Sequence, residues 1–339
     1  MVIGICGFGY TGSGAVKDYL KEFDNIKFGK AEFNYICDTD GLVDLGQHIT
    51  SPFNRTGVIY PIERYIQLYR RYQSGFCKLY GVSKKDYFKS LDEFLNSITT
   101  VEWYDYVRTG NYLRDKFVND FFAIRLIPHL EMTLKRRVNM YPMKKVKLSG
   151  PCVDFYTAAK KHVDQLLKFM DLDPDTNIVL DQAFSANNPA VCFPFFDHVK
   201  AIVVDKDPRD LYVFSKEMLA GYGHFMPIST VEDFVNYYKS IREKQPYKAP
   251  NDNVLVINFE DLIYKYDETT DRINDFLGLD KPKELRRYFD PDVSVGNTQL
   301  FDRYTKYKED ISYIEANLKD YLYDFGRCKK VNVNTKMFV

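Results

Sequence analysis

Short apolar runs alternate with stretches of helical spacing along most of this chain. Residues 2–6 form an apolar run, a glycine-rich segment follows, and apolar side chains then recur at helical spacing from residue 14 to residue 23. This order predicts a strand, a loop and a helix. A second extended piece is predicted at 32–37, where it leads into the acidic turn 38–41.

The middle of the chain has a different character. It is rich in Tyr, Phe, Leu and charged residues, and helical spacing is found over 62–73, 85–97 and 111–139. No linker rich in Pro, Ser or Gly flanks this stretch. We therefore expect a helical insertion at about 61–150 within a single domain that spans residues 1–339.

Strands and helices alternate again after the insertion. The pattern predicts strands at 177–180, 199–205 and 253–258, and helices at 153–170, 210–220, 231–244 and 269–277. Such alternation indicates an α/β fold with a mostly parallel central sheet covered on both faces. Ligands of these sheets bind beyond the carboxyl ends of the strands. The glycine-rich segment and the polar residues that follow the other strands are therefore expected at one rim.

Composition narrows the function classes. The 47 Lys and Arg residues balance the 47 Asp and Glu residues, so no net field draws the protein to nucleic acid or anionic lipid. We find no secretion signal, no run near the roughly 18 apolar residues of a membrane helix, and no metal-binding spacing among the six cysteines. We expect a cytoplasmic protein without a transmembrane segment, a nucleic-acid partner or a metal. The 27 Tyr and 26 Phe favour an aromatic core, with an aromatic-lined groove for a sugar as the alternative.

The glycine-rich segment matches two phosphate-binding patterns at once. Gly7-x-Gly9-x-x-Gly12 is a dinucleotide fingerprint, and the same glycines with Gly14 fit a P-loop in which Ser13 replaces the lysine. In both patterns, glycines let backbone N–H groups approach phosphate oxygens at a helix N-terminus. The segment therefore predicts a phosphate-binding loop.

Three later segments carry further motifs. Residues 202–211, Ile-Val-Val-Asp-Lys-Asp-Pro-Arg-Asp-Leu, run from an apolar strand into a charged helix start. Residues 256–262 end in Phe-Glu-Asp-Leu and lead to Arg-Ile-x-x-Phe-Leu-Gly-Leu at 272–279, and Ser-x-x-Asn-Thr-Gln follows at 294–299. Together with the glycine loop, these segments resemble the sulfotransferases that use 3′-phosphoadenosine 5′-phosphosulfate (PAPS), in particular bacterial-like members. The resemblance implies a P-loop-type three-layer fold, PAPS as the donor and a hydroxyl acceptor, with a polysaccharide as the expected acceptor class.

The resemblance also implies which residues bind the donor. They are Gly9, Tyr10, Thr11, Gly12, Ser13, Gly14, Lys206, Arg209, Ser215 and Asn297. Two positions depart from the family pattern, because Tyr10 stands where the loop usually has a cation and Phe214 stands where a helix serine is usual. Ser215 is the expected substitute for that serine. Lys206 replaces an arginine and keeps its charge, and Arg209 is expected either as a phosphate clamp or in an ion pair at the helix start.

The transfer needs a base that takes the proton of the acceptor hydroxyl. Glu32, which follows the first helix in a Lys-Ala-Glu-Phe context, is the first candidate. Asp181, after a middle strand, is the second, and Asp38 is the third. In place of the missing cation, either Tyr10 is expected to donate a hydrogen bond or a cation is expected from the insertion, where the sequence singles out no residue. Of the histidines, only His224 has a loop-like context that fits such a role.

We therefore expect a sulfotransferase, with three alternatives. A P-loop kinase or other nucleotide-binding transferase is disfavoured because Ser13 replaces the phosphate-binding lysine and Gly14 replaces the Mg²⁺-binding hydroxyl. An NAD-dependent oxidoreductase rests on the fingerprint, since the nearest ribose-binding carboxylate, Asp38, follows Gly12 by 38 − 12 = 26 residues where about 20 are usual. A non-catalytic nucleotide-binding homologue is the third alternative, because of the two departures from the family pattern.

Overall fold

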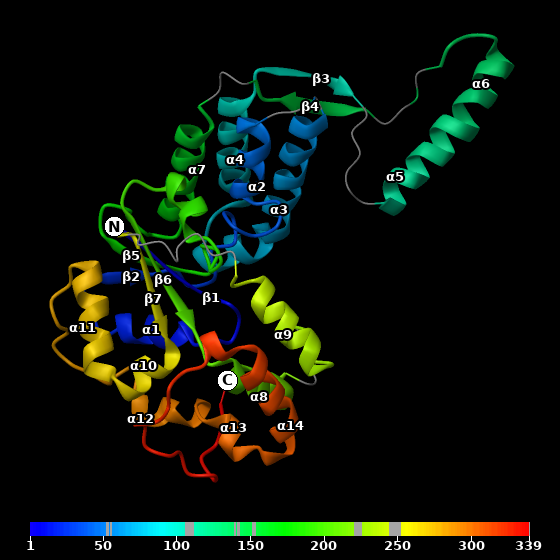
Figure 1. Ribbon diagram of the computed structural model, residues 1–339. Helices are drawn as coiled ribbons and strands as arrows, with labels where there is room; N and C mark the ends of the chain where they lie inside the picture. Colours follow the sequence, from blue (N-terminus) through cyan, green and yellow to red (C-terminus); the bar gives the residue numbers. More distant parts are fainter. Residues whose placement is uncertain are drawn as a thin grey trace. The chain divides into compact units, whose positions relative to one another are not determined.

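The chain consists of two compact units. The computed structural model describes residues 1–51, 54, 56–105, 112–138, 140, 143–150, 154–219, 226–243 and 252–338 (Figure 1). The first unit is formed by Met1–Phe33 and Leu172–Val339, and the second is formed by Asn34–Asp171. The expected insertion at 61–150 lies within the second unit, and the expectation of a single domain over 1–339 stays a prediction.

Five parallel strands form the sheet of the first unit. They are β1 (Val2–Gly7), β2 (Ile26–Phe28), β5 (Asn177–Asp181), β6 (Val199–Asp205) and β7 (Val254–Asn258), in the order β2-β5-β1-β6-β7. Every neighbouring pair in this order is parallel. The predicted α/β fold with a mostly parallel central sheet is therefore confirmed. Because β1 lies at the centre, the glycine loop that follows it emerges at the middle of the carboxyl edge.

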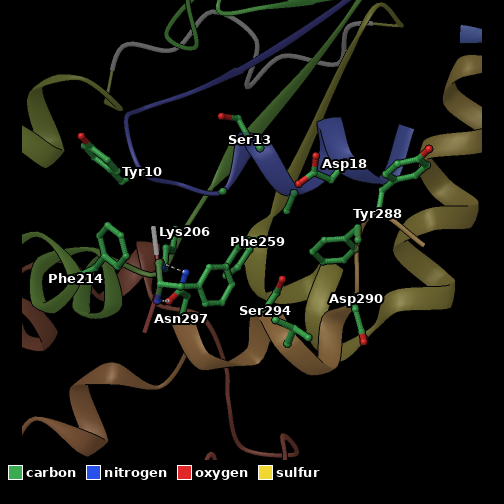
Figure 2. A pocket seen from close by; sticks show the side chains of 16 residues that line it. Tyr10, Ser13, Asp18, Lys206, Phe214, Phe259, Tyr288, Asp290, Ser294 and Asn297 are labelled. Carbon is green, nitrogen blue, oxygen red and sulfur yellow. Dashed lines mark hydrogen bonds between the residues drawn. The ribbon is translucent and has the colours of Figure 1, made fainter. Parts of the chain in front are cut away.

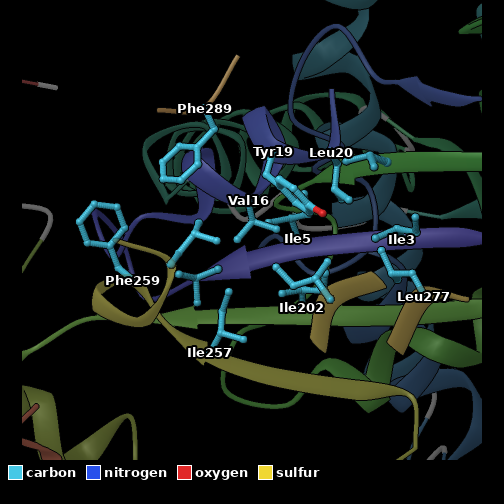
Figure 3. Packing of buried hydrophobic residues seen from close by; sticks show 14 of the residues in the cluster. Ile3, Ile5, Val16, Tyr19, Leu20, Ile202, Ile257, Phe259, Leu277 and Phe289 are labelled. Carbon is cyan, nitrogen blue, oxygen red and sulfur yellow. The ribbon is translucent and has the colours of Figure 1, made fainter. Parts of the chain in front are cut away.

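Helices cover this sheet. In the described part of the first unit they are α1 (Ser13–Leu20), α8 (Pro208–Met218), α9 (Val231–Ser240), α10 (Phe259–Tyr264), α11 (Tyr266–Leu277), α12 (Pro291–Ser294), α13 (Leu300–Arg303) and α14 (Lys308–Asn317), with 3-10 turns at Pro189–Phe195, Val295–Asn297, Thr305–Tyr307 and Lys319–Tyr321. On one face, Ile3 and Ile5 pack in a buried cluster with Val16 of α1 and Leu277 of α11 (Figure 3). Side chains alternate between the faces of a strand, so Gly4 points the other way. There the ring of Phe184 comes so close that a Cβ on Gly4 would lie 2.2 Å from it.

The expected strand at 32–37 is wrong. The strand that precedes the second unit is β2, which pairs with β5, and residues 32–37 form turns instead. Tyr35 and Ile36 are nonetheless buried, and the N–H of Phe33 donates to the carbonyl of Asp181. The apolar pattern there therefore reflects burial of a turn, which periodicity alone does not distinguish from a short strand.

The second unit is mainly helical. Its described elements are α2 (Leu42–Thr50), α3 (Thr56–Tyr80), α4 (Lys84–Ile98), β3 (Val101–Asp105), α5 (Tyr112–Val118), a π-helix (Asn119–Leu126), α6 (Ile127–Leu134), β4 (Lys144–Leu148) and α7 (Phe155–Phe169). The two-stranded antiparallel sheet of β3 and β4 was not predicted. Lys145 and Lys147 of β4 form ion pairs with Glu102 of β3, so charged pairs across the strands, rather than an apolar pattern, characterise this sheet. The predicted helix ends at 111, 139, 153, 220 and 244 lie outside the described residues.

Aromatic side chains build the core of the second unit. Tyr65, Tyr69 and Tyr87 are fully buried, and the rings of Tyr69 and Tyr87 stack with centroids 4.1 Å apart. His162 stacks on Phe94, and burial lowers the pKa of its imidazole to about 3. A neutral ring accordingly lies within hydrogen-bond distance of the Tyr65 hydroxyl, at 2.9 Å. Tyr and Phe residues of this unit therefore form a core, as the aromatic composition led us to expect.

Candidate functional site

The glycine loop is held open by backbone conformation and by one hydroxyl. Gly9, Tyr10 and Gly12 have φ values of 84°, 56° and 95°, in the left-handed region that favours glycine. The Thr11 hydroxyl donates to the carbonyl of Val204 at 2.7 Å and accepts from the N–H of Phe8 at 3.1 Å. Thr11 is buried, so the predicted donor-binding residue acts in the structure by tying the loop to β6.

Gly12 lies against an aromatic ring. A Cβ on this residue would be 2.3 Å from the ring of Phe259, the first residue of α10. Gly12 is also the N-cap of α1, so the close approach fixes where that helix begins. Gly14 has open space around its Cα instead, with nothing within 4 Å of an added Cβ.

A cavity of about 540 Å³ opens at this edge of the sheet (Figure 2). Of the predicted donor-binding residues, those that line it are Tyr10, Gly12, Ser13, Gly14, Lys206 and Asn297. They come from the loop after β1 and the start of α1, from the residue after β6, and from the 3-10 turn before α13, so the structure brings together residues far apart in sequence. A volume of this size suits a small-molecule ligand.

Lys206 brings a buried cation to the cavity. Its side chain is only 3% exposed, and its ammonium lies 5.1 Å from the ring centroids of Phe214 and Phe259. Within the described residues, the ammonium has no hydrogen bond or ion pair. Burial lowers the pKa of Lys206, although the nearby carboxylates oppose this shift. A buried charge without a direct partner is costly, which makes Lys206 a candidate anion-binding group.

The carboxylates near Lys206 bind backbone groups. Asp210 accepts from the N–H groups of Gln299 and Leu300, at 2.7 and 2.6 Å, and so anchors the turn that begins α13. Glu260 accepts from the N–H of Asp207 at 3.0 Å. Burial raises the pKa of both Asp210 and Glu260, so their environment disfavours the charged form. This arrangement supports the walls of the cavity.

Four predicted donor-binding residues do not line the cavity: Gly9, Thr11, Arg209 and Ser215. Arg209 makes a bidentate bond to Asp207 at 3.0 and 2.7 Å, and its remaining donors bind Glu315 and the carbonyl of Tyr323. Arg209 therefore takes part in an ion pair at the helix start, but with Asp207 and not with the adjacent Asp210 that the sequence suggested. Ser215 is 0% exposed and donates to the carbonyl of Leu211, while the adjacent Phe214 lines the cavity.

The predicted bases lie elsewhere. Asp181 forms an ion pair with Lys17 of α1 at 2.8 Å, one turn beyond Ser13, and the neighbouring Gln182 donates to the Ser13 hydroxyl at 3.3 Å. Glu32 is exposed. Neither side chain lines the cavity. Asp38 belongs to the second unit, where it accepts from the Tyr72 hydroxyl, and His224 lies outside the described residues.

The structure adds cavity residues that the sequence reasoning did not assign. Asp18 lines the cavity from α1, and Asp290 and Ser294 line it from α12. Ser294 belongs to the segment that the resemblance singled out, whereas nothing in the sequence marked Asp18 or Asp290. The backbone of Phe338 exchanges two hydrogen bonds with the Asn297 amide, so the last turns of the described chain also form a wall.

The described part of the chain contains neither a metal-binding cluster nor a membrane-spanning helix. No set of three or more His, Cys, Asp or Glu side chains there is placed to hold a metal ion. Within the same residues, no helix has the length and apolar character needed to span a membrane.

The fold and the cavity define an α/β protein in which a glycine-rich loop at the start of α1 and a buried cation face one cavity. No known family model matches this chain, and no curated protein does. Among solved structures, it is similar to a sulfotransferase domain from the curacin biosynthetic pathway, with 15% identity over 95% of this chain and 98% of that one and a TM-score of 0.40. A similarity at this identity and TM-score does not identify the function of this chain.

Gly12 and Gly14 offer a matched test of the loop. Gly12→Ala is expected to lower the free energy of unfolding by about 1–3 kcal/mol, because the new methyl group meets Phe259 and alanine disfavours a positive φ. Gly14→Ala should be neutral or stabilise by up to about 1 kcal/mol, since the space is open and the residue is helical. Urea unfolding measures both. Equal stability of the two variants would contradict this account of the loop.

Arg209 is expected to act on stability. Arg209→Met leaves Asp207 buried without its cation, which should cost about 3–5 kcal/mol of unfolding free energy. Arg209→Met combined with Asp207→Asn should be less destabilised than the single variant, because no buried charge remains unpaired. Chemical denaturation of the two variants decides this. A loss under 1 kcal/mol in Arg209→Met, or no recovery in the double variant, would rule out the structural role.

Proposed function

We propose that this chain is a sulfotransferase that moves a sulfuryl group from PAPS to a hydroxyl group, with a glycan as the acceptor class. One observation supports the donor most directly: two anion-binding elements face the same cavity. The first is the glycine loop at the start of α1, and the second is the buried ammonium of Lys206. PAPS has anionic groups on both its 5′ and 3′ positions, and two separate anion sites suit such a donor.

The alternatives have less support from the same site. A kinase would use a lysine in the loop and a hydroxyl after it, and this chain has Ser13 and Gly14 there. A dehydrogenase needs a carboxylate for the ribose, and the sequence candidate Asp38 is bound to Tyr72 in the second unit. Both therefore rest on the glycine pattern alone.

The proposed transfer balances as a single displacement. The acceptor oxygen forms a bond to sulfur, the bond from sulfur to the bridging phosphate oxygen breaks, and that oxygen keeps the electron pair. The acceptor proton passes to a base. Backbone N–H groups at the start of α1 are placed to stabilise the charge on the departing phosphate. Ser13 and the Tyr10 hydroxyl are the side chains of the loop that can add donors there.

The base is proposed among the carboxylates that follow strands and helices of the first unit. Asp181 has the better position, because its strand neighbours β1 and Gln182 bonds to Ser13. Glu32 remains the candidate that the resemblance favours. Asp18 and Asp290 are carboxylates of the cavity itself, although Asp18 pairs with Lys21 and Asp290 caps α12.

Ligand preference tests the proposed donor. Addition of 3′-phosphoadenosine 5′-phosphate should raise the unfolding free energy, by about 2.7 kcal/mol at 100 times its Kd, whereas ATP with Mg²⁺ and NAD should not. Lys206→Met should weaken this stabilisation, and Lys206→Arg should retain part of it because the charge is kept. Thermal unfolding of each variant without ligand controls for damage to the buried charged residues around Lys206. A preference for ATP or NAD would overturn the proposed donor.

Amide substitutions test the base. In the variant that removes it, kcat should fall about 10²- to 10⁴-fold with little change in donor affinity, since a base acts on the acceptor proton. The variants are Asp181→Asn and Glu32→Gln, and Glu268→Gln, an exposed carboxylate of α11, serves as the control. Sulfate transfer to a panel of glycans is the measurement. A residue whose variant keeps normal kcat is excluded as the base.

A further inference from the structure

The two departures from the sulfotransferase pattern lie side by side in space. Tyr10 belongs to the glycine loop and Phe214 to α8, yet their ring centroids are 5.8 Å apart with an interplanar angle of 37°. Figure 2 shows both rings on the same side of the cavity. Both residues line it. Two substitutions that are unrelated in sequence therefore form one structural feature.

Only one ring of this aromatic pair belongs to the core, because Phe214 is 4% exposed and packs in a buried cluster, whereas Tyr10 is exposed. Tyr10 is 42% exposed, so much of its surface still meets solvent at the cavity. It also adopts a φ of 56°, which is unfavourable for a residue other than glycine. Backbone strain of this kind collects at ligand-binding sites, where the surrounding structure imposes it. An exposed ring on a strained loop is thus placed for contact with a ligand.

A cation lies next to the pair. The Lys206 ammonium is 5.1 Å from the Phe214 centroid, on a buried side chain that reaches the same cavity. The start of α1 provides N–H groups on the loop side. A ligand that matches these groups has a planar ring for the aromatic pair and an anionic ester for the cation and the loop.

We propose that Tyr10 and Phe214 form a stacking platform for the planar ring of a sulfate or phosphate ester, whose anionic group binds at Lys206 and the glycine loop. This inference rests on the proposed function in one respect: both place the ligand in the same cavity. Two sources supply this chemistry, a purine nucleotide such as the PAPS product and a simple aryl ester. In either case, position 10 contributes ring surface where related loops contribute charge.

Binding of three probes tests the platform. The probes are 3′-phosphoadenosine 5′-phosphate, p-nitrophenyl sulfate and inorganic sulfate, titrated by calorimetry against the full chain. At least one ring-bearing probe should bind about tenfold tighter than inorganic sulfate, and Tyr10→Ala should weaken that binding about fivefold or more. Tyr10→Phe should keep the wild-type affinity for that probe, because stacking needs the ring and not the hydroxyl. Tyr313→Ala, an exposed tyrosine of α14, is the matched control.

A double-mutant cycle tests whether the two rings act together. Phe214 is nearly buried, so Phe214→Leu is used to keep apolar volume while the ring is removed. Combined with Tyr10→Ala, it should weaken binding by less than the product of the two single effects, because each ring needs the other to form the platform. Unfolding curves without ligand confirm that the variants are folded.

The outcomes separate this inference from the proposed function. If the nucleotide binds and neither ring-bearing probe loses affinity in Tyr10→Ala, the platform is wrong and the proposed donor stands. If only p-nitrophenyl sulfate binds and its affinity falls in Tyr10→Ala, the platform stands and the proposed donor is wrong. If neither ring-bearing probe binds better than inorganic sulfate, the platform is wrong, and if neither binds at all, the proposed donor is wrong as well.

Discussion

The charged residues that follow β6 constrain the rest of the first unit. Asp205 is paired with Arg242, which lies just beyond the end of α9, Asp207 binds Arg209 and the N–H of Tyr323, and Asp210 binds the backbone at the start of α13. Buried charges are stable only when they are paired or hydrogen-bonded, so each of these contacts requires its partner element to be in place. Four chain segments are fixed around one strand end in this way. Lys206 lies between these carboxylates in the sequence. Among the described residues its ammonium has no hydrogen bond or ion pair, and its side chain lines the cavity.

Much of the first unit could be predicted from the sequence, because short local patterns of residues determine where its strands and its glycine loop lie. Apolar runs marked β5, β6 and β7 to within a residue, and the glycine pattern located the loop before α1. The cavity members Lys206 and Asn297 were found through short motifs that follow strands and helices. Strand β2 was missed because a buried turn nearby has the same apolar pattern as a strand. The two-stranded sheet of β3 and β4 was missed because its strands are paired by charged side chains and lack an apolar pattern.

Side-chain direction was harder to predict than position. Ser215 was expected to replace the serine missing at Phe214, but one residue along a helix is a rotation of about 100°, and that rotation turns Ser215 into the core. Arg209 was assigned two roles because a guanidinium suits a phosphate and a carboxylate equally well, and only the position of Asp207 and Glu315 decides between them. The contact between Tyr10 and Phe214 had no sequence signal at all, since it depends on how α8 meets the loop.

The close packing of Gly12 on Phe259 also has a consequence for the order in which the chain folds. The loop precedes its partners in the sequence: its Thr11 hydroxyl donates to a carbonyl 193 residues later, and Gly12 meets the ring of Phe259, which lies later still. Its strand, β1, pairs on both sides with segments from the second half of the chain. Contacts this distant in sequence form slowly, because a long loop must close before they are made. The loop is therefore among the last parts of this unit to take its final shape, although it precedes its partners in the sequence.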